Sequence, residues 1–214
     1  MDGNRRWAKE RGLHTLEGHK KGLGNFDQAA QWVRDAGVRH LAVYALSTEN
    51  WNRSKEEVSY LLDLFSSAIQ DAFKRLHTEG ARLHFVGDVS RFPENLQKDF
   101  KKLEEESAHN TDFHVWVCVS YGGREEIVTA AQKLQNSHTD ITHETLHKHM
   151  WSAEMPDPDL IIRTGGEKRL SNFLLWQSAY SELFFSDTYW PAFTQEELRA
   201  ILNEYAERER RYGK

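Results

Sequence analysis

Four short apolar runs, separated by longer amphipathic stretches, constrain the fold of this chain more than any other feature. The runs cover residues 40–47, 82–87, 113–120 and 159–164, and they are rich in branched side chains. A weaker fifth run covers residues 182–187. Because strands that are covered on both faces read as near-continuous apolar runs, this pattern favours a parallel sheet.

The stretches between these runs have the periodicity of helices. Apolar residues recur at three- and four-residue steps from Val58 to Leu76, as in a long amphipathic helix. Thr142 and Thr194 stand where helix caps are expected. The alternation predicts an α/β fold, with a mainly parallel central sheet of about six strands flanked by helices. Helices are predicted over residues 19–36, 56–77, 94–108, 124–136, 142–150 and 194–210.

Composition narrows the functional class. At 214 residues the chain is predicted to form a single domain over residues 1–214. The net charge of -5 argues against a general nucleic-acid binder, so any anion site needs a local cluster of cations. Cys118, the one cysteine, indicates a reducing compartment. No apolar run reaches the roughly 20 residues that span a bilayer. These features predict a cytoplasmic protein.

The first residues have the pattern of a loop that follows a strand. MDGNRRW places three turn-forming residues before a basic, helix-like segment, and no apolar run precedes it. A polar loop at a frayed terminus is a poor place for chemistry. We therefore expect a first strand that is missing from this sequence.

The predicted strands all end in polar, glycine-rich segments. In parallel sheets, ligands bind outside the carboxyl ends of the strands. The segment DLIIRTGGEKRLSN at residues 159–172 combines an arginine, a glycine pair and further basic residues. A charged surface turn would explain it, but a phosphate site fits better beside the other strand ends. Those ends are residues 47–51, 87–88 and 120–124.

Six motifs in this order resemble the cis-prenyltransferase family, whose best-known member is undecaprenyl diphosphate synthase. Together they extend over nearly the whole chain, and the set is far more specific than any single motif. They are MDGNRRWA at 1–8, GHKKG at 18–22, YALSTENWNRS at 44–54, SYGGREEI at 120–127, DLIIRTGGEKRLSNFLLWQSAYSEL at 159–183 and RERRYG at 208–213.

The resemblance implies an enzyme that adds isopentenyl diphosphate to an allylic diphosphate, with farnesyl diphosphate as the expected primer. The product would be a Z-polyprenyl diphosphate such as undecaprenyl diphosphate. The family's chemistry requires Mg²⁺ and an apolar substrate tunnel, whose floor corresponds to Phe113 here. A homodimer and transient contact with a membrane surface during product release are also implied.

For the allylic site, the resemblance implies a set of phosphate-gripping residues and one metal ligand. An allylic diphosphate ionises only if the departing pyrophosphate is neutralised by donors, cations and a metal. Asp2 corresponds to the family's Mg²⁺-associated carboxylate, although taken alone it reads as a helix cap. The implied substrate ligands are Gly3, Asn4, Arg6, Trp7, His19 and Arg53.

For isopentenyl diphosphate, the resemblance assigns Arg163, Arg169 and Ser171. Bidentate guanidinium contacts suit a diphosphate, and Gly165 lets the backbone turn without blocking the anion. Glu182 corresponds to a second metal-associated carboxylate; without the resemblance it would be a solvated glutamate. Arg211 and Gly213 match a C-terminal motif that reaches the neighbouring subunit's site; taken alone, this segment is a solvated helix end.

Ser47, Asn50 and Trp51 resemble residues that orient the substrate and assist proton removal. Asn50 is a poor base, so we expect it to position a reacting group, and the identity of the base is open. Packing under a lid explains Trp51 equally well.

Three alternatives differ from an active cis-prenyltransferase. A non-catalytic partner subunit of a heteromeric prenyltransferase would lack parts of the catalytic set, which is complete here. A phosphohydrolase would use Asp2 as its nucleophile, but the other motifs argue against it. The aspartate-rich DDxxD motif of trans-prenyltransferases and the GxxxxGK[ST] phosphate loop are both absent.

Overall fold

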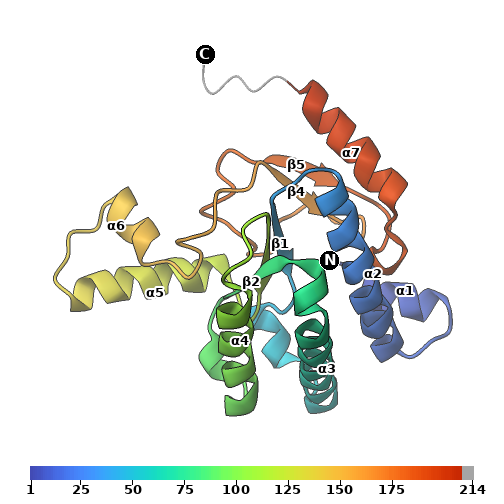
Figure 1. Cartoon of the computed structure of the whole chain (residues 1–214), viewed down its shortest axis with the longest axis horizontal. Coiled ribbons are helices and arrows are strands. Elements are labelled where there is room, and N and C mark those ends of the chain that lie inside the picture. The colour runs from blue at the N-terminus through green and yellow to red at the C-terminus, as the bar shows by residue number, and fades with distance from the viewer. Residues whose placement is uncertain (209–214) are drawn as a thin grey trace. The chain divides into compact units, whose positions relative to one another are not determined.

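The helices and strands alternate as predicted, and Figure 1 traces them along the chain. The structure is a computed structural model that describes residues 1–208, without the side chains of residues 73–79. The described chain forms two compact units. The first comprises residues 1–37, 159–168 and 180–208, and the second comprises residues 38–158 and 169–179. That the whole chain acts as one catalytic domain stays a prediction.

The second unit is built on a three-stranded parallel sheet with the order β1-β3-β2. Its strands are β1 (His40–Tyr44), β2 (Ala81–Val86) and β3 (Phe113–Cys118). Tyr44 and Val86 both lie opposite Cys118, so all three strands end at one edge. The 3-10 helix η1 (Thr48–Asn52) follows β1 at that edge.

Helices α3 (Lys55–Glu79) and α4 (Glu94–Ser107) pack beside each other against this sheet (Figure 1). α3 begins at a cap, where the Ser54 hydroxyl accepts a hydrogen bond from the Glu57 N–H at 3.2 Å. The rings of Phe85 and Phe100 stack between β2 and α4 with centroids 4.3 Å apart. The buried apolar cluster here consists of Leu46, Leu61, Ile69, Phe92, Leu96, Phe100, Leu103 and Val119.

Three histidines and a tryptophan form a ladder across the sheet. His40 lies opposite His114, and His84 lies opposite Trp116, on which it stacks at 3.7 Å. His84 Nε2 and His114 Nδ1 are 3.1 Å apart. Burial, with the nearby positive charge of Arg82 and the other two imidazoles, lowers the pKa of His84 to about 4. The His84 side chain is therefore uncharged at neutral pH.

Two further helices and a short 3-10 helix complete the second unit. The predicted cap of α6 (His143–Lys148) is confirmed, because the Thr142 hydroxyl accepts from the Thr145 N–H at 3.1 Å. The remaining elements are η2 (Val89–Arg91) and α5 (Gly123–Asn136), which packs against α6.

The first unit contains a parallel strand pair and three helices. Its strands β4 (Leu160–Arg163) and β5 (Glu182–Phe185) pair along their whole length. The predicted cap at Thr194 is confirmed, since its hydroxyl accepts from the Glu197 N–H at 3.3 Å. The other elements are α1 (Asn4–Glu10), α2 (Thr15–Asp35), η3 (Trp190–Ala192) and α7 (Gln195–Glu207).

The predicted sheet of about six strands is wrong: the described residues form one three-stranded and one two-stranded sheet. Each apolar run contains a strand, but the strands are shorter than the runs. β1 ends at Tyr44, before the Ser47 turn, and β4 ends where Gly165 and Gly166 take positive φ values of 92° and 79°. Apolar periodicity identifies strands, but it does not determine which strands pair.

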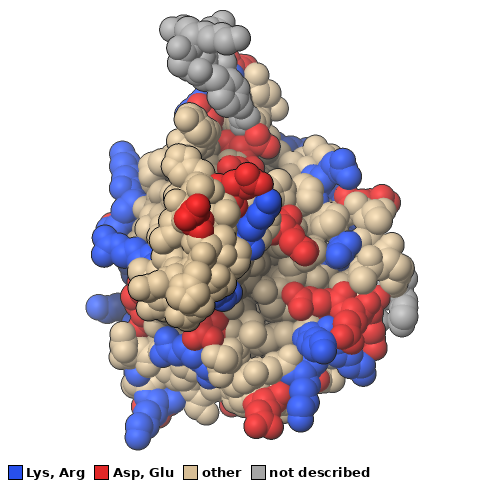
Figure 2. All heavy atoms as spheres, turned by 90° about the vertical axis from the view of Figure 1, so that its left-hand side faces the viewer, with Lys and Arg blue, Asp and Glu red and all other residues tan. Residues whose placement is uncertain are grey.

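Over residues 1–208, no helix is long and apolar enough to cross a bilayer. On the face shown in Figure 2, basic and acidic side chains are both scattered over a mostly uncharged surface. Phosphate recognition therefore requires cations that are concentrated at a particular place.

Candidate active site

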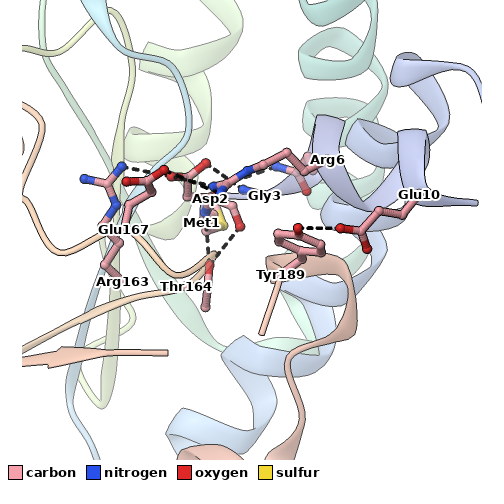
Figure 3. Close-up of polar contacts among 10 residues, drawn as sticks. Met1, Asp2, Gly3, Arg6, Glu10, Arg163, Thr164, Glu167 and Tyr189 are labelled. Carbon is pink, nitrogen blue, oxygen red and sulfur yellow. Dashed lines mark hydrogen bonds and ion pairs between the residues drawn. The ribbon is translucent and has the colours of Figure 1, made fainter. Parts of the chain in front are cut away.

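In the first unit, Asp2 is fixed at the carboxyl end of β4 (Figure 3). The Asp2 N–H donates to the Thr164 hydroxyl at 3.0 Å, and this hydroxyl donates in turn to the Asp2 carbonyl at 3.0 Å. The Trp190 N–H also donates to that carbonyl, at 2.9 Å. Asp2 is thereby held in place by residues more than 160 positions away in the sequence.

The Asp2 carboxylate lies between two guanidinium groups. Arg163 donates to its Oδ2 at 2.8 Å, Arg6 lies 3.4 Å from the same oxygen, and the Gly3 N–H donates to Oδ1 at 2.6 Å. Partial burial raises the pKa of Asp2, but the hydrogen bonds from Arg163 and Gly3 and the two positive charges outweigh it. The pKa of Asp2 is lowered overall, so the carboxylate is ionised at neutral pH.

Two glycines permit this close assembly. Gly3 has φ 100°, and a Cβ there would lie 2.5 Å from Cδ1 of Tyr189. Gly165 has φ 92°, and a Cβ there would lie 2.8 Å from Nη2 of Arg6. The Gly165 and Gly166 N–H groups donate to backbone carbonyls of the 186–188 segment, both at 2.8 Å. The N–H groups of Gly165 and Gly166 are therefore already engaged within the protein.

Arg6 has further contacts that orient its guanidinium group. It lies 3.6 Å from Glu167 and 5.3 Å from the centre of the Tyr189 ring. Tyr189 is anchored in turn by its hydroxyl, which donates to Glu10 at 2.6 Å (Figure 3). Sequence reasoning missed Glu167 and Tyr189. Glu167 lies within a quoted motif, whereas Tyr189 has no signal in the sequence.

The two glycines of the GHKKG motif are required by the close packing of α2 against α1. A Cβ at Gly18 would lie 2.0 Å from the Asn4 carbonyl oxygen, and one at Gly22 would lie 2.2 Å from Asn4 Oδ1. Only glycine at these positions lets α2 approach α1 so closely. The Asn4 side chain is thus packed between the helices, and its predicted contact with substrate rests on its backbone. His19, predicted to grip phosphate, follows Gly18 on α2 and is partly exposed.

Trp7, also predicted as a substrate ligand, lies on α1 under the guanidinium group of Arg11. The two groups are 4.5 Å apart, and Arg11 also donates to the Trp7 carbonyl at 3.1 Å. These contacts belong to the helix itself, so a role for Trp7 toward substrate stays a prediction.

Glu182 lies at the opposite end of the strand pair from Asp2. Glu182 pairs with Leu160 at the start of β4, whereas Arg163, which binds Asp2, is the last residue of that strand. Three strand residues span about 10 Å. The Glu182 carboxylate accepts from Arg208 at 2.6 Å. Within the first unit, therefore, Asp2 and Glu182 do not form one pair of metal ligands.

The residues present suit a magnesium ion that is held partly by its substrate. Among the side chains that the structure describes, no three from histidine, cysteine or acidic residues converge on a metal position. Mg²⁺ keeps several waters and is commonly bound by one or two carboxylates together with substrate phosphates. Asp2 fits that mode, since it is ionised and its side chain is 38% exposed.

In the second unit, Ser47 and Asn50 form a tight turn after β1. The Ser47 N–H donates to Asn50 Oδ1 at 3.2 Å, and the Asn50 N–H donates to the Ser47 carbonyl at 3.0 Å. Ser47 also bridges to Tyr121, which follows β3. Because its oxygen is engaged, Asn50 presents two N–H donors and is unsuited to accept a proton.

Trp51 is partly buried against the apolar cluster of α3 and α4. Its Nε1–H donates to the Ser120 hydroxyl at 3.0 Å, and its ring meets Phe92 edge-on at 5.3 Å. The guanidinium group of Arg91 lies 5.0 Å from the ring centre. These contacts give Trp51 a role in packing, which is one of its two interpretations from the sequence. Its role toward substrate stays a prediction.

The other predicted ligands are distributed between the second unit and the C-terminal segment. Arg53 donates to Glu57 at 2.8 Å. Arg169 and Ser171 are exposed at the start of the 169–179 segment. Arg211 and Gly213 lie outside the described residues, so their predicted role has no structural counterpart here.

Comparison with known proteins places this geometry in a family. A sequence model described as "Putative undecaprenyl diphosphate synthase" matches residues 1–213. An isoprenyl transferase of Neisseria gonorrhoeae is 44% identical over all of this chain and 87% of its own length. The ditrans,polycis-undecaprenyl-diphosphate synthase ((2E,6E)-farnesyl-diphosphate specific) of Escherichia coli is 43% identical, with the same coverage of both chains.

Structural comparison agrees. The crystal structure of lavandulyl diphosphate synthase from Lavandula x intermedia, in complex with dimethylallyl diphosphate, matches with a TM-score of 0.93. It is 36% identical, and the match covers 100% of this chain and 95% of that one. The fold and the arginine-lined carboxylate thus define a transferase of prenyl groups. The chain belongs to the undecaprenyl diphosphate synthase family, as its motifs predicted.

Proposed function

We propose that this enzyme condenses isopentenyl diphosphate with an allylic diphosphate, farnesyl diphosphate first, to give a Z-polyprenyl diphosphate such as undecaprenyl diphosphate. The observation that carries the proposal is the Asp2 carboxylate, which is held between Arg163 and Arg6 at the end of β4. The farnesyl diphosphate specificity in the name of the Escherichia coli relative supports farnesyl diphosphate as the primer.

The first chemical requirement is departure of pyrophosphate from the allylic carbon. We assign Arg6 to the departing pyrophosphate, whose developing negative charge it would offset. Arg163, which the resemblance assigns to isopentenyl diphosphate, contacts the same Asp2 oxygen, and we propose that it also supplies a positive charge to the leaving group. Mg²⁺, when bound at Asp2 and the phosphates, would supply further charge neutralisation. Glu167 and Tyr189 orient Arg6.

The second requirement is attack by isopentenyl diphosphate. The terminal carbon of its double bond forms a bond to the allylic carbon. A proton then leaves the CH₂ group that lies between the former double bond and the carbon that bears the diphosphate. Arg169 and Ser171 are the ligands we propose for its diphosphate in the second unit. Asn50 donates hydrogen bonds that orient a reacting group, and the structure assigns no base.

The growing chain needs an apolar environment. We place the predicted tunnel along the cluster between α3, α4 and the three-stranded sheet, whose side chains are aliphatic or aromatic. Phe113, which is 3% exposed at the start of β3, is the proposed floor.

We also propose that the enzyme is a cytoplasmic homodimer with transient membrane contact during product release. Leu183 and Phe185 alternate along β5 and are exposed by 38% and 36%, and Tyr180 nearby is 80% exposed. Exposed apolar side chains on a strand suit burial against a second copy. The family match gives no support to the alternative of a non-catalytic partner subunit.

The test is incubation with Mg²⁺, farnesyl diphosphate and labelled isopentenyl diphosphate, followed by sizing of the products. We expect a ladder of elongated diphosphates that disappears in EDTA. A parallel reaction with dimethylallyl diphosphate alone, the ligand bound in the lavender enzyme, tests a different use of the site. If only that second reaction gives a product, elongation is not the function.

A further inference from the structure

Asn172 is fixed by hydrogen bonds of both its backbone and its side chain. It lies in the left-handed region with φ 69°, directly after Ser171, which has φ 49°. Its Oδ1 accepts from the Arg124 N–H at 2.9 Å, and its carbonyl accepts from the Gly123 N–H at 2.7 Å. Its Nδ2 donates to Glu125 at 2.9 Å and to Glu49 at 3.1 Å. All the polar groups of the side chain are therefore engaged.

These bonds join three segments of the second unit. Glu49 belongs to η1, between Ser47 and Asn50, and Gly123 begins α5. Asn172 itself belongs to the 169–179 segment, which also carries Arg169 and Ser171. The junction explains a glycine of the SYGGREEI motif, because a Cβ at Gly122 would lie 2.7 Å from Asn172 Nδ2.

The fold of the 169–179 segment has an anchor of its own. Gln177, which is 1% exposed, donates to the buried carboxylate of Glu126 at 2.9 Å. Tyr121 donates to the same carboxylate at 2.6 Å, and Ser152 donates to its other oxygen at 2.7 Å. Because this network holds the buried end, loss of the Asn172 side chain should reorient the exposed end without unfolding the segment.

We propose that Asn172 is a positioning residue that sets Ser171 and Arg169 against the Ser47–Asn50 turn. The inference rests on the proposed function, in which Arg169 and Ser171 bind isopentenyl diphosphate and the turn orients the reacting group. The amide suits this place because its two N–H donors hold two carboxylates, those of Glu49 and Glu125, beside each other. An aspartate would place a third negative charge there.

Two substitutions separate the side chain from the backbone. Asn172→Gly keeps the left-handed φ accessible and removes the three side-chain bonds. Asn172→Asp keeps the size and shape of the side chain but replaces its N–H donors by an acceptor oxygen. Adding Glu125→Gln to this variant restores one donor–acceptor pair and the local net charge. Asn136→Gly, at the exposed end of α5, is the matched control.

We expect both single variants to raise the KM for isopentenyl diphosphate about 10-fold or more, as loss of bonds to charged groups predicts. The KM for farnesyl diphosphate and the melting temperature should stay near wild-type values. The Asn172→Asp/Glu125→Gln pair should recover much of the loss, and Asn136→Gly should show none. Calorimetric titration with isopentenyl diphosphate supplies the same comparison without turnover.

Unchanged kinetics in Asn172→Gly would overturn the inference. So would a parallel loss of kcat, both KM values and melting temperature, since that describes a merely structural residue. If the wild-type enzyme binds isopentenyl diphosphate but makes no elongated product, the proposed function fails while the titrations still decide the role of Asn172. If the wild type does not bind it, both proposals fail.

Discussion

Replacing Asp2 by asparagine should have opposite effects on anion binding and on catalysis. Asparagine retains the shape of the side chain and an oxygen that can accept from the Gly3 N–H. It removes the negative charge that Arg163 and Arg6 now neutralise. We therefore expect Asp2→Asn to bind inorganic pyrophosphate more tightly without metal, and to turn over far more slowly with Mg²⁺.

The contacts of Asp2 set the magnitude. Arg163 and Arg6 lie 2.8 Å and 3.4 Å from its carboxylate. Two unit charges about 4 Å apart interact by roughly 1 kcal/mol in water and roughly 4 kcal/mol at an effective dielectric constant of 20. Since Asp2 is 38% exposed, the lower part of that range applies. A gain of about 1–2 kcal/mol corresponds to roughly 5- to 30-fold tighter pyrophosphate binding. Loss of metal-assisted departure should slow turnover by about 100-fold or more.

The assay pairs calorimetric titration of pyrophosphate in a chelating buffer with turnover in Mg²⁺. Asp159→Asn makes the same change of charge beside the other end of β4 and is the control for net charge. We expect the control to leave both quantities nearly unchanged. Weaker metal-free binding in Asp2→Asn, or near-normal turnover, would refute the reasoning.

Four further predictions test other parts of the molecule. Arg169→Ala should raise the KM for isopentenyl diphosphate, because a lost charge-assisted contact costs roughly 1.5–3 kcal/mol; a selective loss of farnesyl diphosphate binding would show that the two sites are interchanged. Phe113→Ala should lengthen the products on sizing, and an unchanged distribution would place the floor elsewhere. Stability should fall as pH drops from the usual histidine value of 6.5 toward 4, because the lowered pKa of His84 leaves the folded state binding fewer protons than the unfolded state. With screening at this half-buried site, the loss is about 1–2 kcal/mol, and thermal melts of His84→Phe should show less of it. Mixing Asp2→Ala with Arg211→Ala chains should restore activity to about half per mixed dimer if the Arg211 side chain acts across a two-fold interface; no restoration would place it in its own subunit.

The strands and helices were predictable because their signals are local. β5 was the weakest prediction and proved correct as Glu182–Phe185, where three consecutive apolar residues follow the glutamate. Pairing was not predictable, because it depends on where each backbone turns. The described residues pair as one sheet of three strands and one of two, an arrangement that apolar runs alone do not encode.

The site was predictable only where motifs carried it. The motifs identified Asp2 and Arg6 for the allylic site and Arg163 for isopentenyl diphosphate, and the structure brings all three together. Tyr189 was missed, because its role comes from contacts with Arg6 and Gly3 that no spacing encodes. Asn172 lies within a motif, but its importance shows only in its hydrogen bonds.

The geometry of the newly formed double bonds tests the central claim most directly. The wild-type enzyme would be incubated with Mg²⁺, farnesyl diphosphate and ¹³C-labelled isopentenyl diphosphate, and the product examined by NMR. The account predicts that every added unit carries a Z double bond, with the two original E double bonds of farnesyl diphosphate retained. Added units with E geometry, or no incorporation of label, would contradict it.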